Sequence, residues 1–578
     1  MIHRRRHPGF IVLIVMVIIV MLTLAGLAFV LNLSLENQAV HVQGDQQQLQ
    51  QTLASGIELM RGFLAQSPSA RQQAGGTHQN SAVFAAVSLS PDSAASDDTR
   101  FSILSPQDET EASSEVRFGL QNESARLNLS VLLDWEQDQP GAASQALMQL
   151  PGMTEPIADA ILDWIDGDDT PRPSGAEADY YVGRGLPYEP RNDVPAVLEE
   201  LLLVRDVSRA SLFGTDTNAN FRQDSDSHQT LHAAGNTTSG QTPWARLLTL
   251  YSAEANRTFQ GEPRIDLNQD ELQPLHQQLT KAFDQRTADF VVAYRQFGPQ
   301  APTVDGSSPS AAAAAGATSG ASSPSSRWGT KPPPDGQAVS LDLSQPAEYR
   351  IESILDLIEA RVFLPPESQP DDTLPETVQE STSQAPANDL LDESLEDLLE
   401  IPLEEISELS EESQPMREVP NPFADQRDQL RDDLPQWFDL TTTVDQDVIR
   451  GRVNINQAGR LILLGIPELD ESLVDRILAA RDGFSSDAGE QYRYPIWLYT
   501  EGLVDLEQMR RLEPYLTCGG DVYRAQIVAF GESTRLVARG EVVLDASVSP
   551  PRQVYWKDLG LLGRGFTDAE LGLQTDLR

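Results

Sequence analysis

Residues 10–31 read FIVLIVMVIIVMLTLAGLAFVL, a run of 22 positions without a charged side chain. As a helix this run would be about 33 Å long at roughly 1.5 Å per residue, enough to cross the ~30 Å hydrocarbon core of a bilayer. Arg4, Arg5 and Arg6 precede it, which favours a cytoplasmic start and export of the rest. The run is too long for an ordinary cleaved secretory signal, whereas a plain signal anchor remains an alternative. The sequence therefore predicts a single-pass, membrane-anchored, exported protein.

The residues before this run form a short basic leader, 1–9, that ends in Gly9 directly before Phe10. This arrangement resembles a type IV prepilin signal. The resemblance implies a prepilin peptidase that cleaves between Gly9 and Phe10 and leaves the transmembrane helix, 10–33, attached.

Most prepilin-like proteins have a glutamate five residues into the mature chain, where this sequence has Ile14. In a filament that carboxylate neutralises the terminal ammonium of a neighbouring subunit, because an unpaired charge is costly in an apolar bundle. A subunit at the tip has no neighbour above it to pair with. The missing acid therefore fits a tip protein.

An amphipathic helix is expected after the anchor, because apolar residues recur three or four positions apart. They are Leu49, Leu53, Ile57, Met60 and Leu64. We expect this helix to continue the membrane helix as a spine under a small sheet, within 34–124. A generic juxtamembrane helix is the alternative.

Alternating apolar and polar residues predict strands at both ends of the soluble part. The early runs are AVFAAVSLS (82–90), RFSIL (100–104) and EVRFGL (115–120), and the late runs are VYRAQIVAF (522–530), LVARGEVVLDA (536–546) and RQVYWKDL (552–559). They suit an antiparallel sheet with one face covered, with 517–578 supplying its last strands and a tail. The predicted fold class is α+β, a long N-terminal helix on a pilin-like antiparallel sheet that a large helical insertion interrupts.

That insertion contains a repeat with the order basic, apolar, Asn/Asp, apolar. Its copies begin at Arg126, Arg264 and Arg452. The first leads to the turn 150–153 and IADAILDWID, and the third to the turn 464–467 and LVDRILAARDGF. Each outlines a helix-hairpin-helix or SAM-like unit, whereas the middle copy lacks a clear glycine turn. We therefore expect helical domains at 125–299 and 436–516.

Segments rich in polar or small residues separate these units. Residues 300–345 are rich in Ala, Ser, Gly and Pro, 365–435 are dense in Asp, Glu, Ser and Pro, and 214–243 form a polar loop. We expect the first two to be disordered linkers around a short ordered segment, 346–364. Their acidity accounts for much of the net charge of −45, which argues against nucleic acid as a general partner.

The most specific stretch is DWIDGDDTPRPSGAEADYY, residues 163–181. With SARLNL and LPGM upstream, it resembles the helical domain of type II secretion protein K, whose pattern is DWxDxDxxP followed by GAExxxY. The matching residues are Asp163, Trp164, Asp166, Asp168, Pro171, Gly175, Ala176, Glu177 and Tyr181.

This resemblance implies a minor pseudopilin of a type II secretion system, at the tip of the pseudopilus, that assists protein secretion across the outer membrane. It implies an inner-membrane anchor with the bulk of the chain in the periplasm. The implied partners are other minor pseudopilins, the major pseudopilin, the prepilin peptidase and the inner-membrane secretion platform.

Crowded carboxylates in the same stretch form a candidate calcium site, because their repulsion calls for neutralisation and calcium takes six to eight oxygen ligands. The candidates are Asp163, Asp166, Asp168, Asp169, Glu177 and Asp179. The alternative is that several of these acids cap helices or face water. The family resemblance, which includes calcium sites, favours calcium.

A second candidate metal site resembles an EF-hand loop. Its first, third, fifth and ninth positions are Asp216, Asn218, Asn220 and Asp224. However, Phe221 stands where glycine belongs, and Ser227 stands where a bidentate glutamate belongs.

No signature of a catalytic nucleophile, a zinc protease or a nucleotide-binding loop is present, so we expect a protein that is not an enzyme. Cys518 is the only cysteine, which excludes an intrachain disulfide. The main rival is a membrane-anchored helix-hairpin-helix protein for DNA binding or uptake, since glycine turns can hold phosphate. The acids after Pro151 oppose it. A generic anchored scaffold is a third possibility.

Overall fold

The computed structural model describes residues 9–89, 99–107, 116–222, 224, 242–299, 341–365, 417–423, 427–481, 489–531 and 536–573. The chain divides into two compact units. The first comprises Met1–Arg264, Arg431–Leu440 and Gln446–Arg578, and the second Ile265–Leu430 and Thr441–Asp445. The helical domain expected at 125–299 is therefore divided after Arg264, because the chain that follows packs within the second unit.

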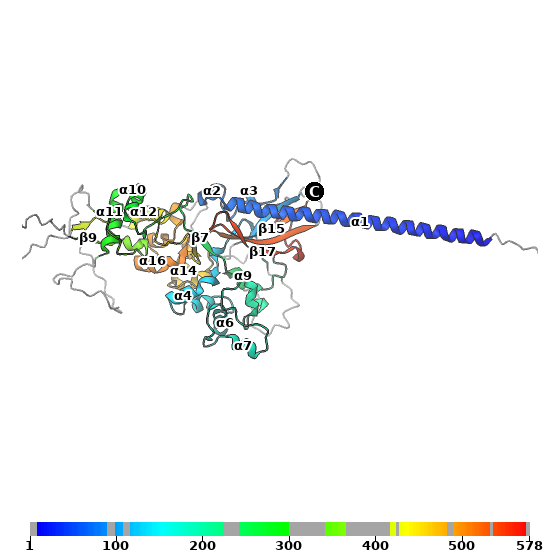
Figure 1. Ribbon diagram of the computed structural model, residues 1–578, viewed down its shortest axis with the longest axis horizontal. Coiled ribbons are helices and arrows are strands. Elements are labelled where there is room, and N and C mark those ends of the chain that lie inside the picture. The colour runs from blue at the N-terminus through cyan, green and yellow to red at the C-terminus, as the bar shows by residue number, and fades with distance from the viewer. Residues whose placement is uncertain are drawn as a thin grey trace, which may run out of the picture. The chain divides into compact units, whose positions relative to one another are not determined.

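The anchor and the spine form one continuous helix of 56 residues, α1 (Gly9–Leu64). Its apolar N-terminal part is exposed, with Leu13 at 59% and Phe29 at 63%. Among the described residues it is the one helix long and apolar enough to cross a membrane. The expected apolar face beyond it is confirmed, since Leu49 and Met60 are almost fully buried. One helix thus joins a lipid-compatible part to a part that packs on protein (Figure 1).

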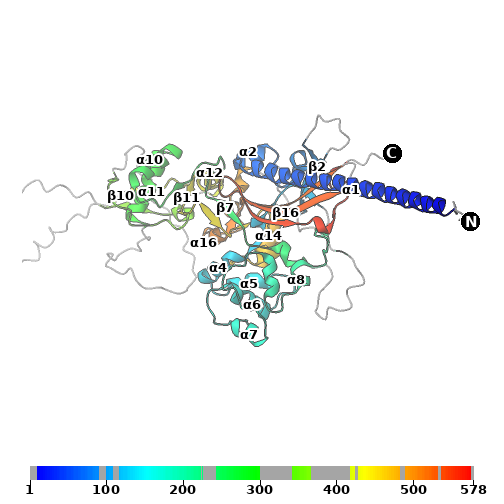
Figure 2. The same cartoon turned by 45° about the vertical axis from the view of Figure 1, so that its right-hand side comes forward.

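The C-terminal part of α1 packs on an antiparallel sheet (Figures 1 and 2). Its strands, in spatial order, are β1 (Val87–Ser88), β2 (Thr99–Pro106), β15 (Val522–Gly531), β16 (Val537–Asp545) and β17 (Arg552–Asp558), with β3 (Val116–Phe118) on β2 and β4 (Gln121–Asn122) on β15. At Gly56 an added Cβ would lie 2.7 Å from the side chain of Ile527, so glycine lets helix and sheet approach closely. Strands from both ends of the chain therefore share one sheet, as predicted.

One predicted strand is partly wrong. In the run 82–90, α3 (Ser81–Phe84) occupies the first residues, and only the two residues of β1 pair with β2. The cause is Asn80, whose side chain accepts a hydrogen bond from Val83 N at 3.3 Å and caps a helical turn.

The first unit also contains helices outside the sheet. Besides α1 and α3, those of four or more residues are, in chain order, α2 (Pro68–Gln73), α4 (Leu132–Asp138), α5 (Ala142–Met148), α6 (Glu155–Ile165), α7 (Ala178–Gly183), η3 (Leu198–Leu203), α8 (Arg209–Phe213), α9 (Trp244–Leu247), α12 (Arg427–Leu440), α13 (Arg460–Leu464), α14 (Glu471–Arg481), α15 (Trp497–Thr500) and α16 (Leu506–Leu512). Most of α12 belongs to this unit, from Arg431 onward.

The three sequence repeats share one local structure, a two-residue strand that pairs in parallel with a later one. The pairs are β5 (Leu127–Asn128) with β6 (Leu248–Thr249), β8 (Ile265–Asp266) with β11 (Thr441–Thr442), and β13 (Val453–Asn454) with β14 (Leu516–Thr517). The second pair lies in the second unit.

Each repeat places an Asn or Asp where its side chain bonds the backbone two residues on. Asn128 Oδ1 accepts from Ser130 N, Asp266 Oδ1 from Asn268 N, and Asn454 Oδ1 from Asn456 N, at 2.8–2.9 Å. These Asx turns explain why the repeat needs a short acceptor side chain at this position. The middle copy therefore repeats the local structure of the other two, although its sequence is the least similar.

A helix pair follows the first strand of each repeat: α5 with α6, α10 (Leu272–Ala282) with α11 (Gln285–Phe297), and α13 with α14. In the first pair Gly152 holds the left-handed backbone, with φ of 71°. In the third pair Glu468 holds it, with φ of 68°, while Gly465 has a right-handed φ of −79°. The turn expected at 464–467 is therefore present, but its left-handed residue is Glu468 rather than Gly465.

The second unit also contains η4 (Ile354–Leu357) and β9 (Val362–Leu364), which pairs with β10 (Arg417–Val419). β10 and residues 427–435 of α12 lie inside the range 365–435 that was expected to be a linker. Ordered structure returns there because Val419 and Leu434 bury apolar surface. The other predicted linker residues, 300–340 and 366–416, lie outside the described chain, as do leader residues 1–8 and most of the polar loop.

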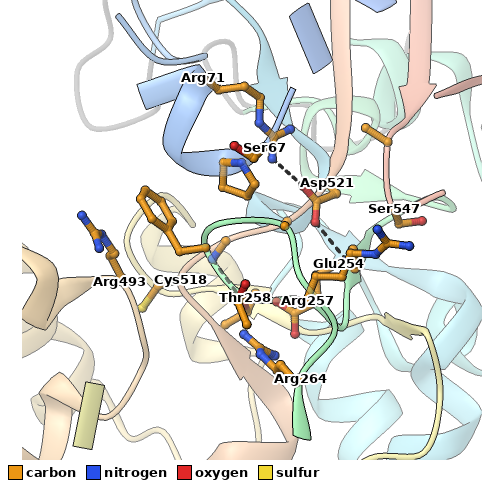
Figure 3. Close-up of a pocket in the computed structure, with 18 of the residues that line it drawn as sticks. Ser67, Arg71, Glu254, Arg257, Thr258, Arg264, Arg493, Cys518, Asp521 and Ser547 are labelled. Carbon is orange, nitrogen blue, oxygen red and sulfur yellow. Dashed lines mark hydrogen bonds and ion pairs between the residues drawn. The ribbon is translucent and has the colours of Figure 1, made fainter. Parts of the chain in front are cut away.

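The end of the spine is tied to the sheet by an ion pair. Arg71 Nη2, on α2, donates to Asp521 Oδ1 at 2.8 Å, and Asp521 Oδ2 accepts from Ala255 N at 2.9 Å (Figure 3). Ala255 ends β7 (Ala253–Ala255), which pairs with β12 (Val448–Arg450). Asp521 directly precedes β15, so one carboxylate joins three segments that are distant in the sequence.

Candidate functional site

The acidic stretch 163–181 begins on α6, where Asp163 is fully buried. Both of its oxygens are used: Asp163 Oδ1 accepts from Arg172 Nη1 at 3.0 Å, and Asp163 Oδ2 accepts from Ala176 N at 2.7 Å. A buried carboxylate is tolerated only with such donors. Asp163 therefore holds the loop that returns to α6, and it has no free oxygen for a metal ion.

The glycine of the GAE motif permits this contact. A Cβ at residue 175 would overlap the Asp163 carboxylate, so only glycine lets the loop come this close. Two neighbouring bonds hold the same loop, because Asp159 Oδ2 accepts from Ser174 N at 3.0 Å and Arg205 Nη1 donates to Gly175 O at 2.8 Å.

The aromatic residues of the motif pack against each other. The rings of Trp164 and Tyr181 are 5.6 Å apart in an edge-to-face arrangement, and Tyr188 packs on both. Trp164 Nε1 donates to Glu200 Oε1 at 3.2 Å, and Tyr181 Oη accepts from Arg205 N at 3.2 Å. The tryptophan and tyrosine of the motif thus form the core beneath the acidic loop.

Glu177 differs from Asp163, because it is buried without a compensating partner. Its side chain is 4% exposed, and within the described part of the chain neither carboxylate oxygen has a hydrogen-bond partner. Burial, reinforced by the charges of Asp163, Asp166, Asp169 and Asp168, raises the pKa of Glu177 to about 7. This carboxylate is the one in the stretch that most needs a cation.

The remaining acids lie around the same loop. Asp166 forms an ion pair with Arg172, yet its Oδ1 is buried without a hydrogen-bond partner among the described residues, and burial raises its pKa. Asp168 and Asp169 are exposed, and Asn192 Nδ2 donates to Asp169 Oδ1 at 3.0 Å. Asp179 is exposed in the first turn of α7.

The residues present suit a cation only in part. Buried oxygens of Glu177 and Asp166 without partners are the donor type that calcium takes. However, in the portion of the chain that is described, no three His, Cys, Asp or Glu side chains are arranged to hold a metal ion.

The second predicted site, at residues 216–224, folds as a turn around Asp216. Asp216 Oδ1 accepts from Asn220 N at 3.1 Å, and Asp216 Oδ2 accepts from Phe221 N at 2.9 Å. Phe221, at the usual glycine position, has a left-handed φ of 68°. Asp224 points elsewhere in the loop, to Thr217 N at 3.0 Å, and Ser227 lies outside the described residues.

A side chain from the sheet already supplies positive charge to this turn. Arg539, on β16, is fully buried and donates from Nη1 to Asn218 O at 2.8 Å and from Nη2 to Ala219 O. Burial lowers the pKa of Arg539 to about 10, and Asn220 Nδ2 donates to Gly565 O at 3.1 Å. The turn therefore binds the sheet through an arginine.

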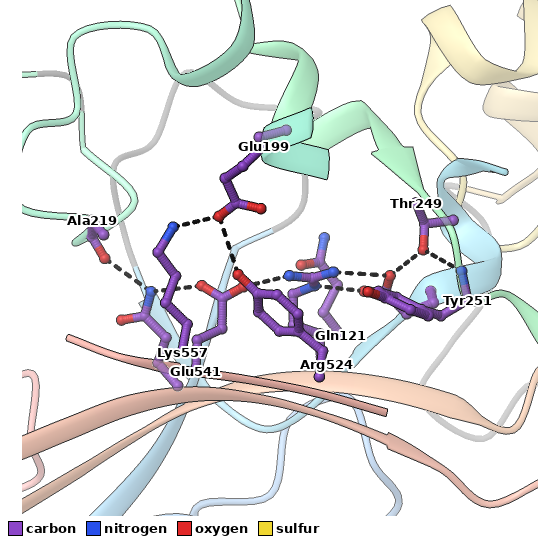
Figure 4. A network of polar contacts seen from close by, with 12 residues as sticks. Gln121, Glu199, Ala219, Thr249, Tyr251, Arg524, Glu541 and Lys557 are labelled. Atoms are coloured by element: carbon purple, nitrogen blue, oxygen red, sulfur yellow. Dashed lines mark hydrogen bonds and ion pairs between the residues drawn. The ribbon is translucent and has the colours of Figure 1, made fainter. Parts of the chain in front are cut away.

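A buried ion network joins the helical region to the sheet beside this turn (Figure 4). Arg524, on β15, donates from Nε to Glu123 Oε1 at 2.8 Å and also pairs with Glu541 on β16. Thr249 Oγ1 donates to the other oxygen of Glu123. Burial alone would raise the pKa of Glu123, but Arg524 and Arg126 outweigh it and lower this pKa to about 2.

A second contact lies farther along the sheet. Glu199, on η3, accepts from Lys557 Nζ at 2.6 Å and from Tyr555 Oη at 3.2 Å, both on β17 (Figure 4). Glu123 therefore ties its segment to β15, and Glu199 ties η3 to β17. Sequence reasoning missed this network, since the partners are hundreds of residues apart.

The sequence matches the family model described as "Type II secretion system (T2SS), protein K" over residues 125–212. This range contains the acidic loop, its aromatic core and Glu199. No curated protein matches the chain.

Proposed function

We propose, from the match of residues 125–212 to the type II secretion system protein K model, that this chain is a minor pseudopilin. Its place would be the tip of the pseudopilus of a type II secretion system. There it would assist protein secretion across the outer membrane, by assembly rather than by catalysis.

The observation that carries this proposal is the difference in exposure between the two parts of α1. Its N-terminal part exposes apolar side chains, and its C-terminal part is buried on the sheet. An uncovered apolar helix fixed to a folded head can first lie in the membrane and then pack beside like helices. The absence of an acid at Ile14 supports a terminal place in that bundle.

The partners proposed are the other minor pseudopilins, the major pseudopilin, the prepilin peptidase and the inner-membrane platform. The chain would be a single-pass inner-membrane protein with most of its mass in the periplasm. A DNA-uptake role is disfavoured by Glu468, which places a carboxylate at a hairpin turn and pairs with Arg511 Nε at 3.0 Å.

Calcium would bind at the acidic loop of the protein K domain. Glu177 and Asp166 supply the buried oxygens without partners, with Asp168 and Asp169 beside them. When bound, the ion would neutralise Glu177 and stiffen the loop between α6 and α7.

Crosslinking in secreting cells tests the proposed role. A cysteine at Leu13, in the uncovered part of α1, should crosslink to other pseudopilins in a Cys518→Ser background. A cysteine at Glu58, which is exposed beside the sheet, is the control and should crosslink less. Crosslinks absent at Leu13, together with normal secretion after deletion of the gene, would refute the proposal.

A further inference from the structure

A cavity of about 480 Å³ lies in the first unit, at the end of the spine. Its walls come from the α1–α2 turn, the loop after β7, residues 493–495 and the segment that leads into β15. Arginines dominate its charge: Arg71, Arg257, Arg264, Arg452 and Arg493 line it, against Glu254, Glu513 and Asp521. This excess is opposite to the composition of the chain, which has 42 basic and 87 acidic residues.

Asp521 and Glu254 are held by contacts within the wall of the cavity. Asp521 uses one oxygen for Arg71 and the other for Ala255 N. Glu254 Oε1 accepts from Arg452 Nη1 at 3.2 Å, and Glu254 Oε2 accepts from Thr517 Oγ1 at 2.5 Å. These acids therefore hold two arginines in place and leave little capacity to neutralise the others.

Arg71 presents an unused donor in this cavity. The residue is 6% exposed, and its Nη1 is buried without a hydrogen-bond partner among the described residues, although Nη2 pairs with Asp521 (Figure 3). A buried cationic N–H without an acceptor is costly and uncommon. An oxygen from a ligand would satisfy it.

Other arginines are arranged to share such a ligand. Arg257 is exposed at the rim. Arg493 stacks on the ring of Phe259, with its guanidinium carbon 3.9 Å from the ring centre. Arg493 Nη1 also donates to Glu490 Oε1 at 3.2 Å. Stacking fixes the plane of the guanidinium, and its other N–H groups suit contacts with a planar anion.

We propose that this cavity binds an anion that carries at least two carboxylates, with Arg71 Nη1 as the buried contact and Arg257 as the contact at the rim. Arginine forks match carboxylate geometry, and the volume admits a small organic acid or two adjacent acidic side chains. The ligand is therefore either a free polycarboxylate or an acidic stretch of polypeptide. This inference does not depend on the proposed assembly role.

Binding to the full chain in detergent micelles at low salt tests the proposal. The probes are citrate and the acetylated, amidated peptide Glu-Glu-Glu, titrated by calorimetry. We expect saturable binding that weakens at least tenfold in Arg257→Gln and in Arg71→Lys. The matched control is Arg450→Gln, on β12, which is exposed and does not line the cavity; its affinity should be unchanged.

The two probes separate the sources of the carboxylates. Displacement of the peptide by citrate would show that free carboxylates suffice, and binding of the peptide alone would show that an acidic stretch of polypeptide is the ligand. Melting curves confirm the folding of each variant, and Arg257→Gln decides if Arg71→Lys fails to fold. Failure of both probes to saturate, or equal weakening in Arg450→Gln, would overturn the proposal.

Discussion

The carboxylate of Asp163 lies against the backbone of Gly175, in a space that no side chain can share. This contact lets Ala176 N reach Asp163 Oδ2 at 2.7 Å and closes the acidic loop. Asp163 and Gly175, twelve positions apart in the motif, are thus in direct contact.

Gly175→Ala should therefore destabilise the region 125–212 by about 2–3 kcal/mol, because the methyl group displaces the loop and leaves Asp163 short of a donor. Denaturant unfolding followed by tryptophan fluorescence measures the change. Gly167→Ala is the control, since a Cβ there meets nothing within 4 Å. Equal stability of the two variants would contradict the account.

Calcium should raise the melting temperature of the chain, because a ligand that binds only the native state stabilises it by mass action. Thermal unfolding with calcium and with a chelator measures the effect, at pH 7.5, where Glu177 is mostly ionised. Glu177→Gln should remove most of the shift. A wild-type melting temperature that is the same in calcium and in chelator would exclude this site.

In chelator, stability should fall as the pH rises from about 4.5 to about 7, because the folded state raises the pKa of Glu177 to about 7. Over this window the native state binds more protons than the unfolded state, and the loss is at most about 3 kcal/mol. Below the window both states hold the proton, so the effect is absent. Glu177→Gln, compared with wild type at each pH, should abolish this component. A difference that does not vary with pH would refute it.

Glu123→Gln should cost about 3–5 kcal/mol, because it removes one partner from a buried ion network and leaves Arg524 with Glu541 alone. Since the pKa of Glu123 is lowered to about 2, its contribution is present above about pH 4.5 and is lost as the pH falls toward 2. Equilibrium unfolding at pH 7 and at pH 3 measures both effects.

The control for this variant is Glu58→Gln. Glu58 is 65% exposed and pairs with Arg61 on the surface of α1, so its loss should change stability by less than about 1 kcal/mol. Similar costs for the two variants would mean that the network at Glu123 does not hold the helical region on the sheet.

Gly9→Val should block removal of the leader if the prepilin assignment is right. Mass spectrometry of the membrane-extracted chain reads the N-terminus, which should be Phe10 in wild type and Met1 in the variant. Gly26→Ala is the control, because an added Cβ there has open space, and it should be processed normally. Processing of Gly9→Val at the wild-type site would support a generic anchored scaffold instead.

The parts of the fold that the sequence predicted are those with a clear period. The spacing of Leu49 and Leu53 predicted the buried face of α1, and alternation in 522–559 predicted β15, β16 and β17. The strand prediction around Ser81 was wrong because the side chain of Asn80 caps a helical turn there. The linker prediction for 427–435 was wrong because the acids and Pro435 drew attention away from Leu430 and Leu434, which are buried.

The sequence identified the acids of the candidate site but not their contacts. The spacing of the acids does not show that Arg172 and Ala176 saturate Asp163, since local sequence carries no signal for which carboxylate is buried. The same holds for Arg539, which reaches the turn at Asn218 from more than three hundred residues away.

The parallel pair β8–β11 joins residues 265–266 to 441–442, and within the first unit Arg264 Nε donates to Asp439 O at 3.1 Å. The chain therefore leaves the first unit after Arg264 and returns to it near Asp439, and these two points lie close together. Lengthening an inserted segment whose two ends lie close together costs little, because loop-closure entropy grows only logarithmically with length. Each doubling of the segment costs roughly 0.6 kcal/mol. Evolution can lengthen this excursion, or shorten it, while the pilin-like head and its anchor keep their packing. Relatives should accordingly differ most in size between these two strands.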